Sequence, residues 1–346
     1  MPPAPDRLKA DYDRARNAVA LLERTDRGLI EAAGPDRAAW LNNLVTNVVK
    51  TLGPGDGNYA FAVNVKGRVI FDMNILVLDD LALPEGRLWL DIDAGWITDA
   101  MKHLDRHIIT ENVTLTDRIR DFHRWALLGP RAAAVVERLG FGNLVPMAQL
   151  QHVEHPFDGG TVRAVRHDFA GVPGVELLVS AAASDALRQR LIECGSNDNI
   201  APIDPAAVHI LRVEAGIPAS RIDIDAEVIP PETSQIERGI NYKKGCYLGQ
   251  EVIERMRSRG MLPRQLVGVR LSGRAVPALP LSLSRDGNDL GRVTTVVWSF
   301  ALDAPLALAY VKSAHAAPGT KLTATSAEGT ALDGQIVAFP LRASSS

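Results

Sequence analysis

The segment from Lys243 to Glu251, Lys-Lys-Gly-Cys-Tyr-Leu-Gly-Gln-Glu, has the most distinctive chemical pattern in the chain. It places Cys246, one of only two cysteines, beside two lysines and two glycines where a helix is expected to begin. Nearby ammonium groups and the partial positive charge of a helix N-terminus both favour a thiolate. We therefore predict an accessible thiolate at Cys246 that acts as a nucleophile, a redox group or a transient metal ligand. The alternative is a small apolar residue in a tight turn, the usual fate of a free cysteine.

The same loop supplies further candidates for a functional site. Its glycines allow close backbone approach, its lysines supply charge, and its last two polar residues either take part in the site or bind the first amides of the following helix. These candidates are Lys244, Gly245, Tyr247, Gly249, Gln250 and Glu251. Cys194 ends a helical pattern and is expected in the core.

Two other places in the chain combine charged groups with apolar neighbours. Asp72 interrupts an apolar strand, where a carboxylate can bind an amine or a pterin N–H, or can simply face outward. Arg212 and Glu214 lie in the last turn of a predicted helix. The planar guanidinium group of Arg212 can bind a carboxylate or the edge of a heterocycle. An ion pair within the protein is an equally good interpretation.

Composition limits the possible functions. The chain has 346 residues, 46% of them hydrophobic, with 38 basic and 41 acidic side chains. A net charge of −3 gives no general attraction to nucleic acid or anionic lipid, so we expect neither as a partner. The histidines lack the spacing of a zinc site, so no metal site is predicted. Two cysteines and the absence of an apolar segment long enough to span a membrane indicate a cytoplasmic protein without a membrane span, and we expect a monomer.

The elements that position these residues can be predicted from turns and periodicity. The first half is predicted to contain helices over 7–24, after Asp36, and over 95–107, with strands over 28–33, 59–65, 68–78 and 88–92. The second is predicted to contain strands over 125–128 and 175–179 and helices over 131–139 and 184–194. Gly34-Pro35 and Gly129-Pro130 follow the first strand of each half, which suggests two related α+β halves.

The remainder divides into a helical part and a β-rich part. Asp204 and Pro205 predict the start of a helix that ends before Gly216. After Arg264, short β-rich runs separated by turns are typical of an antiparallel barrel. We therefore expect a body over 7–260, with sub-lobes over about 28–118, 119–200 and 201–260, and a barrel over 262–342.

The order of these motifs resembles a known superfamily. The stretch Lys244-Gly245-Cys246-Tyr247-x-Gly249-Gln250-Glu251 resembles the YgfZ family of folate-binding proteins, which is linked to maintenance of iron–sulfur enzymes. The wider superfamily is that of the glycine cleavage T-protein, a tetrahydrofolate-dependent aminomethyltransferase. Arg212-Val213-Glu214-Ala215-Gly216 and the hairpin Asn64 to Asp72 resemble two further segments of that superfamily.

This resemblance implies an α+β body of three lobes around a central folate cavity, followed by a β-barrel. It implies that Asp72 lies near the pterin or its one-carbon position, that Tyr59 helps to line the pocket, and that Arg212, in the segment that includes Glu214, contacts folate. It also places Asp93 where the T-protein has an asparagine. Cys246 would carry the family-specific activity, and tetrahydrofolate or a derivative is the expected cofactor.

One departure from the T-protein bears on the reaction. The counterpart of its Tyr-Thr-Gly-Glu-Asp-Gly segment is Ala170 to Gly174, where Val172 replaces a folate-binding glutamate. Losing that carboxylate removes a charge-assisted hydrogen bond of about 1.5–3 kcal/mol, which argues against aminomethyl transfer.

We therefore expect a tetrahydrofolate-binding protein that assists assembly or repair of iron–sulfur clusters through the Cys246 thiol. Its partners would be folate and client iron–sulfur enzymes or assembly proteins. The alternatives are a tetrahydrofolate-dependent aminomethyltransferase and a non-catalytic folate-binding sensor or storage module. The aminomethyltransferase would depend on Asp72 rather than on Cys246.

Overall fold

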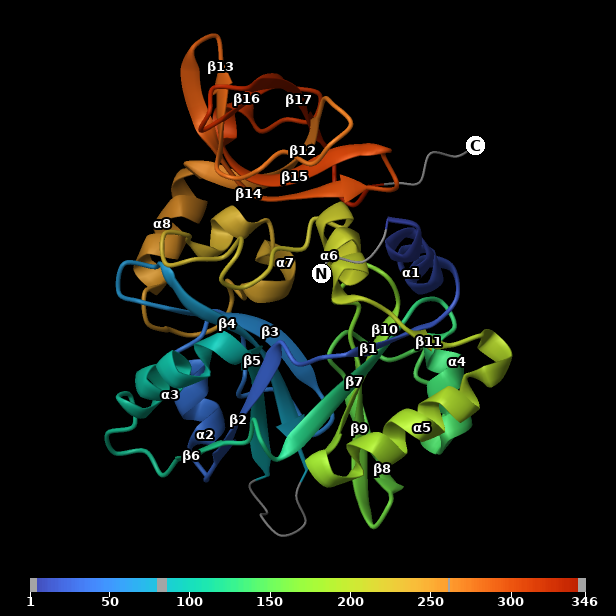
Figure 1. Ribbon diagram of the computed structural model, residues 1–346. Coiled ribbons are helices and arrows are strands. Elements are labelled where there is room, and N and C mark those ends of the chain that lie inside the picture. The colour runs from blue at the N-terminus through green and yellow to red at the C-terminus, as the bar shows by residue number, and fades with distance from the viewer. Residues whose placement is uncertain (1–4, 80–85, 261, 342–346) are drawn as a thin grey trace.

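The computed structural model describes residues 5–79, 86–260 and 262–341. It contains two sheets and a closed barrel (Figure 1). The two sheets lie side by side, and the barrel lies over a layer of helices above them. The mixed α+β architecture with a C-terminal antiparallel barrel is therefore the predicted one.

The first sheet has five antiparallel strands in the order β3-β4-β5-β2-β6. They are β2 (Arg27–Ala33), β3 (Gly57–Val63), β4 (Val69–Leu78), β5 (Arg87–Asp93) and β6 (Thr114–Asp117). Helices α2 (Arg37–Asn42) and α3 (Ile97–Asp105) bury Trp40, Leu41 and Leu104 against one face. The predicted turn at Gly67 joins β3 to β4, and its φ of 71° suits glycine.

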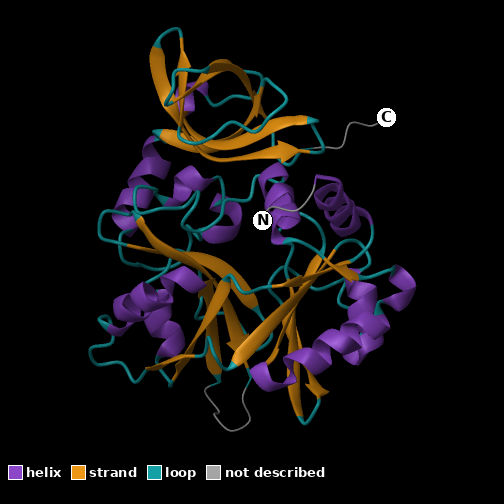
Figure 2. Ribbon diagram, in the orientation of Figure 1, coloured by secondary structure: helices purple, strands orange, loops and turns teal. Residues whose placement is uncertain are grey.

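The second sheet has six strands in the order β11-β1-β7-β10-β9-β8. They are β1 (Ala20–Glu23), β7 (Phe122–Leu128), β8 (His152–Phe157), β9 (Gly160–Arg166), β10 (Gly174–Ser180) and β11 (Ala201–Pro202). Helices α4 (Ala132–Val136) and α5 (Ser184–Cys194) belong to this half. Figure 2 shows the helices of both halves on the outer sides, so the sheets face one another across the middle.

The two halves are duplicated in topology. The order β3-β4-β5-β2 of the first sheet recurs as β8-β9-β10-β7 in the second. Gly34 and Gly129 follow the equivalent strands β2 and β7 with φ of 107° and 116°. A Cβ at Gly34 would lie 2.2 Å from the Asn112 carbonyl oxygen, and one at Gly129 would lie 2.4 Å from that of Ala18. The shared Gly-Pro pattern therefore marks the same type of turn at equivalent places in the two halves.

The N-terminal prediction was wrong in one respect. The helix expected over 7–24 is α1 (Pro5–Asn17), and the segment after it is strand β1. Ala20, Leu21 and Leu22 are buried between two neighbouring strands, which accounts for an apolar run that also fits the end of a helix. Consequently, an N-terminal strand completes the second sheet rather than the first.

Besides β1, the sequence pattern did not predict strands β6, β8, β9 and β11. Strands β6, β8 and β11 lie at sheet edges, where one side needs no apolar cover, and β11 has only two residues. Strand β9 contains two arginines among valine and alanine and begins with the exposed Gly160 and Thr161. Short or half-polar strands of this kind carry little periodic signal.

A third group of helices lies under the barrel. It contains α6 (Pro205–Glu214), α7 (Ile236–Gly239) and α8 (Gln250–Arg259). Asp204 caps α6 as predicted, because its Oδ1 accepts from the Ala206 amide at 2.8 Å. Helix α6 packs against α1, β14 (Asn288–Ser299) and β15 (Ala304–Lys312), so it joins the body to the barrel.

The barrel closes in the order β12-β15-β14-β13-β16-β17. Its remaining strands are β12 (Arg264–Leu271), β13 (Leu281–Arg285), β16 (Lys321–Ser326) and β17 (Ala331–Val337). Closure leaves no free edge, which suits a domain of short strands.

Candidate functional site

A cavity of about 560 Å³ lies where the three parts of the body meet. The β1–β2 connection, strands β3 and β4, the β9–β10 loop, and helices α6 and α7 all line it. Its polar and aromatic lining includes Arg27, Tyr59, Asp72, Asn74, Asp93, His167, Phe169, His209, Arg212 and Arg238. A cavity of this size and mixed lining is typical of a small-molecule site.

Tyr59 and Asp72 form a hydrogen-bonded pair at this cavity. They project from paired strands β3 and β4, and the Tyr59 hydroxyl donates to Asp72 Oδ2 at 2.8 Å. Both side chains are buried, and Asp72 Oδ1 has no hydrogen-bond partner among the described residues. Burial and the Asp72 charge raise the pKa of Tyr59 well above its ordinary value, so this hydroxyl stays protonated. The pair thus presents one free carboxylate oxygen.

A buried ionic network supports the same wall. Asp91 Oδ1 lies 3.0 Å from Arg27 Nε and 2.8 Å from Arg124 Nη1, and Asp91 Oδ2 accepts from Asn74 at 2.7 Å. Arg124 also donates to Glu176 on the second sheet. Burial alone would raise the pKa of Asp91, but Arg124 and Arg27 outweigh it and lower that pKa to about 2. The network therefore stays charged and links the two sheets.

Arg212 lines the cavity but already has partners in the protein. Its Nη1 donates to Asp223 at 2.7 Å and to the Ile217 carbonyl at 3.0 Å, and its Nε donates to His209 at 3.2 Å. Asp223 is fully buried. The internal ion pair that the sequence left open therefore exists, with Asp223 rather than Glu214 as the partner.

Glu214 lies away from the cavity, contrary to the expectation that it binds folate. Its carboxylate accepts from the Tyr12 hydroxyl at 2.6 Å, the Ser299 hydroxyl at 2.6 Å and the Ala301 amide at 3.0 Å. The side chain is buried where α6 meets α1 and the barrel. Positions two residues apart lie on nearly opposite sides of a helix, so Arg212 and Glu214 have different surroundings.

Asp93 lines the cavity and also begins a helix. Its Oδ1 accepts from the Gly95 amide at 2.9 Å and lies 3.6 Å from Arg221 Nη1. The first of these contacts is that of an N-cap residue. Asp93 can therefore contribute charge at the rim while holding the chain after β5.

The cysteine loop does not line the cavity, so the Cys246 thiol, expected to carry the family-specific activity, lies away from the candidate folate site. Cys246 and Gly245 are exposed, and Glu251 pairs with Arg255 on the outer surface of α8. A Cβ at Gly249 would lie 2.3 Å from the Asn64 carbonyl oxygen, so the loop packs closely on the β3–β4 turn. Gln250 is the first residue of α8.

Lys244 anchors this loop through hydrogen bonds to backbone carbonyl groups. Its Nζ donates to the carbonyl oxygens of Asn42, Val45 and Asn47, the last at 2.9 Å. Burial and the nearby Lys50 lower the pKa of Lys244 to about 7. The Tyr247 ring lies 4.9 Å from that Nζ and packs in the core between the sheets. These contacts fasten the loop to the chain after α2.

Arg238 was missed by the sequence analysis. It lies on α7, and its guanidinium carbon is 4.1 Å from the centroid of the Tyr59 ring. Arg27, Asn74, His209 and Phe169 were missed as well. No motif or period marks these residues, because they converge from separate elements.

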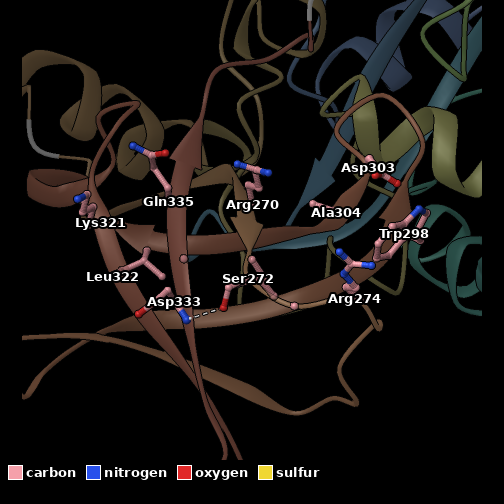
Figure 3. A pocket seen from close by; sticks show the side chains of 13 residues that line it. Arg270, Ser272, Arg274, Trp298, Asp303, Ala304, Lys321, Leu322, Asp333 and Gln335 are labelled. Carbon is pink, nitrogen blue, oxygen red and sulfur yellow. Dashed lines mark hydrogen bonds between the residues drawn. The ribbon is translucent and has the colours of Figure 1, made fainter.

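A larger hollow of about 840 Å³ lies on the barrel (Figure 3). It contains charged side chains from several strands and the ring of Trp298. Its charged residues are all exposed: Arg270, Arg274, Asp303, Lys321 and Asp333. Exposed charges remain hydrated and do not require a ligand, whereas the free oxygen of Asp72 is buried. The central cavity is therefore the stronger candidate site.

Comparison with known proteins identifies the family. Residues 3–244 match the GCVT N-terminal domain, and residues 264–341 match the glycine cleavage T-protein C-terminal barrel domain. The chain belongs to the glycine cleavage T-protein superfamily. This confirms the wider resemblance, while the YgfZ-type subfamily is not confirmed.

The relatives with the most similar sequences that we describe are named aminomethyltransferases. An aminomethyltransferase of Symbiobacterium thermophilum is 30% identical over 347 residues, covering 95% of this chain and 88% of that protein. An aminomethyltransferase of Rubrobacter xylanophilus is 28% identical and covers 88% and 79% of the two chains. The crystal structure of glycine cleavage system aminomethyltransferase T from Bartonella henselae has a TM-score of 0.85, at 21% identity, covering 96% and 89%. This last likeness supports the fold.

These relatives overturn the leading functional expectation. Assistance to iron–sulfur clusters through Cys246 was wrong, because relatives over most of the chain are named aminomethyltransferases. The alternative of an aminomethyltransferase fits them better. Client iron–sulfur proteins have no support. Aminomethyltransferases of this family use tetrahydrofolate, so the expected cofactor is confirmed for the family.

Two further findings concern metals and membranes. Within residues 5–79, 86–260 and 262–341, no group of three or more His, Cys, Asp or Glu side chains is arranged to hold a metal ion. In that same part of the chain, no helix combines the length and the apolar character needed to cross a membrane.

Proposed function

We propose that the chain is a tetrahydrofolate-dependent one-carbon transferase of the aminomethyltransferase class, with the central cavity as its site. One observation carries this proposal: Asp72 Oδ1 is a buried carboxylate oxygen without a partner among the described residues, beside Tyr59 at the cavity. A buried acceptor left unsatisfied costs about 1–3 kcal/mol or more. An N–H group of a bound ligand would remove that cost.

The cavity suits a reduced folate in size and chemistry. Its volume of about 560 Å³ lies within the usual range of about 300–1,000 Å³ for such sites. Phe169 offers an aromatic face, with the Arg24 guanidinium carbon 4.0 Å from its ring centroid. Tetrahydrofolate would supply the nitrogen that accepts the one-carbon unit.

The residues that line the cavity would bind the folate and orient it for the transfer. Asp72 would accept a hydrogen bond from the folate and favour positive charge near the reacting nitrogen, while Tyr59 holds the carboxylate in place. Arg27, Asp91 and Asn74 would keep the wall behind them rigid. Preorganised charges in a water-poor site are an efficient means of stabilising charge that develops during a reaction.

Val172 in place of a folate-binding glutamate is compatible with the proposed transfer reaction. Phe169, directly before the segment that contains Val172, lines the cavity, whereas Val172 packs beside the core of α6. The site therefore has aromatic contact from this loop where the T-protein has a glutamate, and Asp72 would provide the carboxylate.

The decisive test is turnover of an aminomethyl-lipoyl donor with tetrahydrofolate by the full chain. Asp72→Asn should abolish turnover, because the neutral amide loses the charge, while Cys246→Ala should leave it unchanged. Circular dichroism and thermal melting would verify that both variants fold. No turnover by the natural chain, or full activity of Asp72→Asn, would refute the proposal.

Two finer assignments belong to this proposal. We propose that the chain lies near the YgfZ-type branch, which the likeness of its cysteine loop supports, and that its function depends on the central cavity. The chain is also divided into a body over 7–260, with the sub-lobes given above, and a barrel over 262–342, whose last residue lies outside the described residues. Limited proteolysis should cut between these parts.

A further inference from the structure

Arg238 lines the cavity and uses only one of its five N–H groups within the described part of the chain. Its Nε donates to Gln235 Oε1 at 2.6 Å, and its two terminal nitrogens have no hydrogen-bond or ion-pair partner among the described residues. Its guanidinium carbon lies 4.1 Å from the Tyr59 ring centroid. The side chain thus offers four N–H groups at the cavity on a fixed support.

The backbone around Arg238 is held tightly. The Asn47 amide donates to the Arg238 carbonyl at 2.9 Å, and the Thr46 hydroxyl donates to the Gly239 carbonyl at 2.6 Å. A Cβ at Gly239 would lie 2.5 Å from the Phe61 ring, so α7 lies directly against β3. The position of Arg238 over Tyr59 is therefore determined by packing from several elements.

Arg238 and Asp72 both contact the same phenol side chain. The guanidinium lies over the ring of Tyr59, and the carboxylate receives the hydroxyl of that ring. The Arg238 guanidinium carbon lies 4.1 Å from the ring centroid of Tyr59, and Asp72 Oδ2 lies 2.8 Å from its hydroxyl, so one compact ligand can reach both groups. A ligand that satisfies both must present an N–H and an oxygen acceptor on one compact ring system.

We propose that Arg238 determines specificity by donating to the carbonyl oxygen of the pterin ring whose N–H group binds Asp72. This inference rests on the proposed function and identifies the end of the folate that occupies this wall. The pterin carries N–H donors and a carbonyl oxygen on one bicycle. The glutamate carboxylates of folate lie beyond the p-aminobenzoyl group, too far from the pterin to contact Arg238 over Tyr59 while the pterin binds Asp72.

Ligand affinity measured by calorimetry on the full chain tests this proposal. Arg238→Gln should weaken binding of tetrahydrofolate and of tetrahydropteroate, which lacks glutamate, by the same factor. A hydrogen bond to a charged donor is worth about 1.5–3 kcal/mol, so the factor should be about 10–150. A 4-amino-4-deoxy analogue has no carbonyl oxygen, and its affinity should change little in Arg238→Gln.

Two further variants exclude a merely structural effect. Gln235→Ala removes the support of Arg238 and should cause a smaller loss with the same ligand pattern. Arg238→Lys keeps the charge without the fork and should recover part of the affinity. Melting temperatures would verify that each variant folds.

The outcomes separate this inference from the proposed function. Loss of tetrahydrofolate affinity with unchanged tetrahydropteroate affinity would assign Arg238 to the glutamate tail and overturn the inference. Equal losses for the 4-amino analogue, or no loss for any ligand, would also overturn it. Failure of the natural chain to turn over, with folate binding and this ligand pattern intact, would refute only the transferase proposal.

Discussion

Arg212 donates to Asp223 at 2.7 Å, and this buried ion pair fixes the loop that forms one wall of the cavity. Asp223 also accepts from the Ala219 amide at 2.9 Å and from the Thr295 hydroxyl at 2.7 Å. It therefore binds the loop after α6 to the barrel. Arg212, expected from the sequence to contact folate, therefore also holds this junction together while it lines the cavity.

Asp223→Ala should destabilise the protein strongly. Removing one member of a buried pair leaves Arg212 uncompensated, a change that costs about 3–5 kcal/mol. Urea denaturation would measure the loss. Asp225→Asn is the matched control, because Asp225 pairs with the half-exposed Arg292 and should cost less than about 1 kcal/mol. Equal losses for the two variants would contradict this account.

Tyr59→Phe should lower kcat/KM for the transfer reaction by up to about tenfold, which corresponds to a hydrogen bond worth about 0.5–1.5 kcal/mol. The variant keeps the ring beneath Arg238 but leaves both Asp72 oxygens to the ligand and to solvent. Steady-state kinetics would measure kcat/KM. Phe61→Tyr is unsuitable as a control, because Phe61 is fully buried and the added hydroxyl would disturb the core. Tyr242→Phe, outside the cavity lining, should leave the kinetics unchanged.

His103→Gln should make stability less sensitive to acid. Burial, His107 and Arg106 lower the pKa of His103 to about 4, against an ordinary value of 6.5. Between pH 6.5 and 4 the unfolded chain binds a proton that the folded chain does not, so stability falls as pH falls. Removing the imidazole should reduce this slope by up to about 1.4 kcal/mol per pH unit.

Denaturation curves from pH 4.5 to 7 would measure that slope. His315→Gln serves as the control, since His315 lies in the barrel outside the buried core. A slope unchanged by His103→Gln would show that His103 binds its proton equally well in the folded and unfolded chains, which would contradict this account.

Lys244→Met should destabilise the cysteine loop. The variant leaves the carbonyl oxygens of Asn42, Val45 and Asn47 without their ammonium donor, at a cost of about 1–3 kcal/mol. Proteolysis of the native protein should become faster in this loop. Lys243→Met changes an exposed lysine and should alter stability by no more than about 0.5 kcal/mol. Identical behaviour of the two variants would assign Lys244 no structural role.

The fold could be predicted where local chemistry sets it. Asp204 and Pro205 begin α6 through a cap and a fixed φ, and Gly34 and Gly129 meet backbone that excludes a Cβ. Both effects are visible in the sequence. The apolar run at Ala20 could not be assigned to a strand, because its partners are more than 100 residues away.

The site was only partly predictable for the same reason. Asp72 breaks an apolar strand and can be noticed without a structure. Arg238 reaches the cavity from a four-residue helix, and its role depends on the ring of Tyr59 from another element. The cysteine loop has a strong local pattern, yet residue spacing does not reveal which surface a loop faces. Its prominence therefore led to the wrong functional assignment.

Strand β1 has a consequence for biosynthesis. Ala20 pairs with Leu128 on one side and with Ala201 on the other. A chain emerging from the ribosome has made this strand long before either neighbour exists. The first half can assemble without it, since β2 to β6 pair only among themselves. Strand β1 therefore stays unpaired until the second half is synthesised. An unpaired apolar strand makes the nascent chain prone to aggregation at this stage.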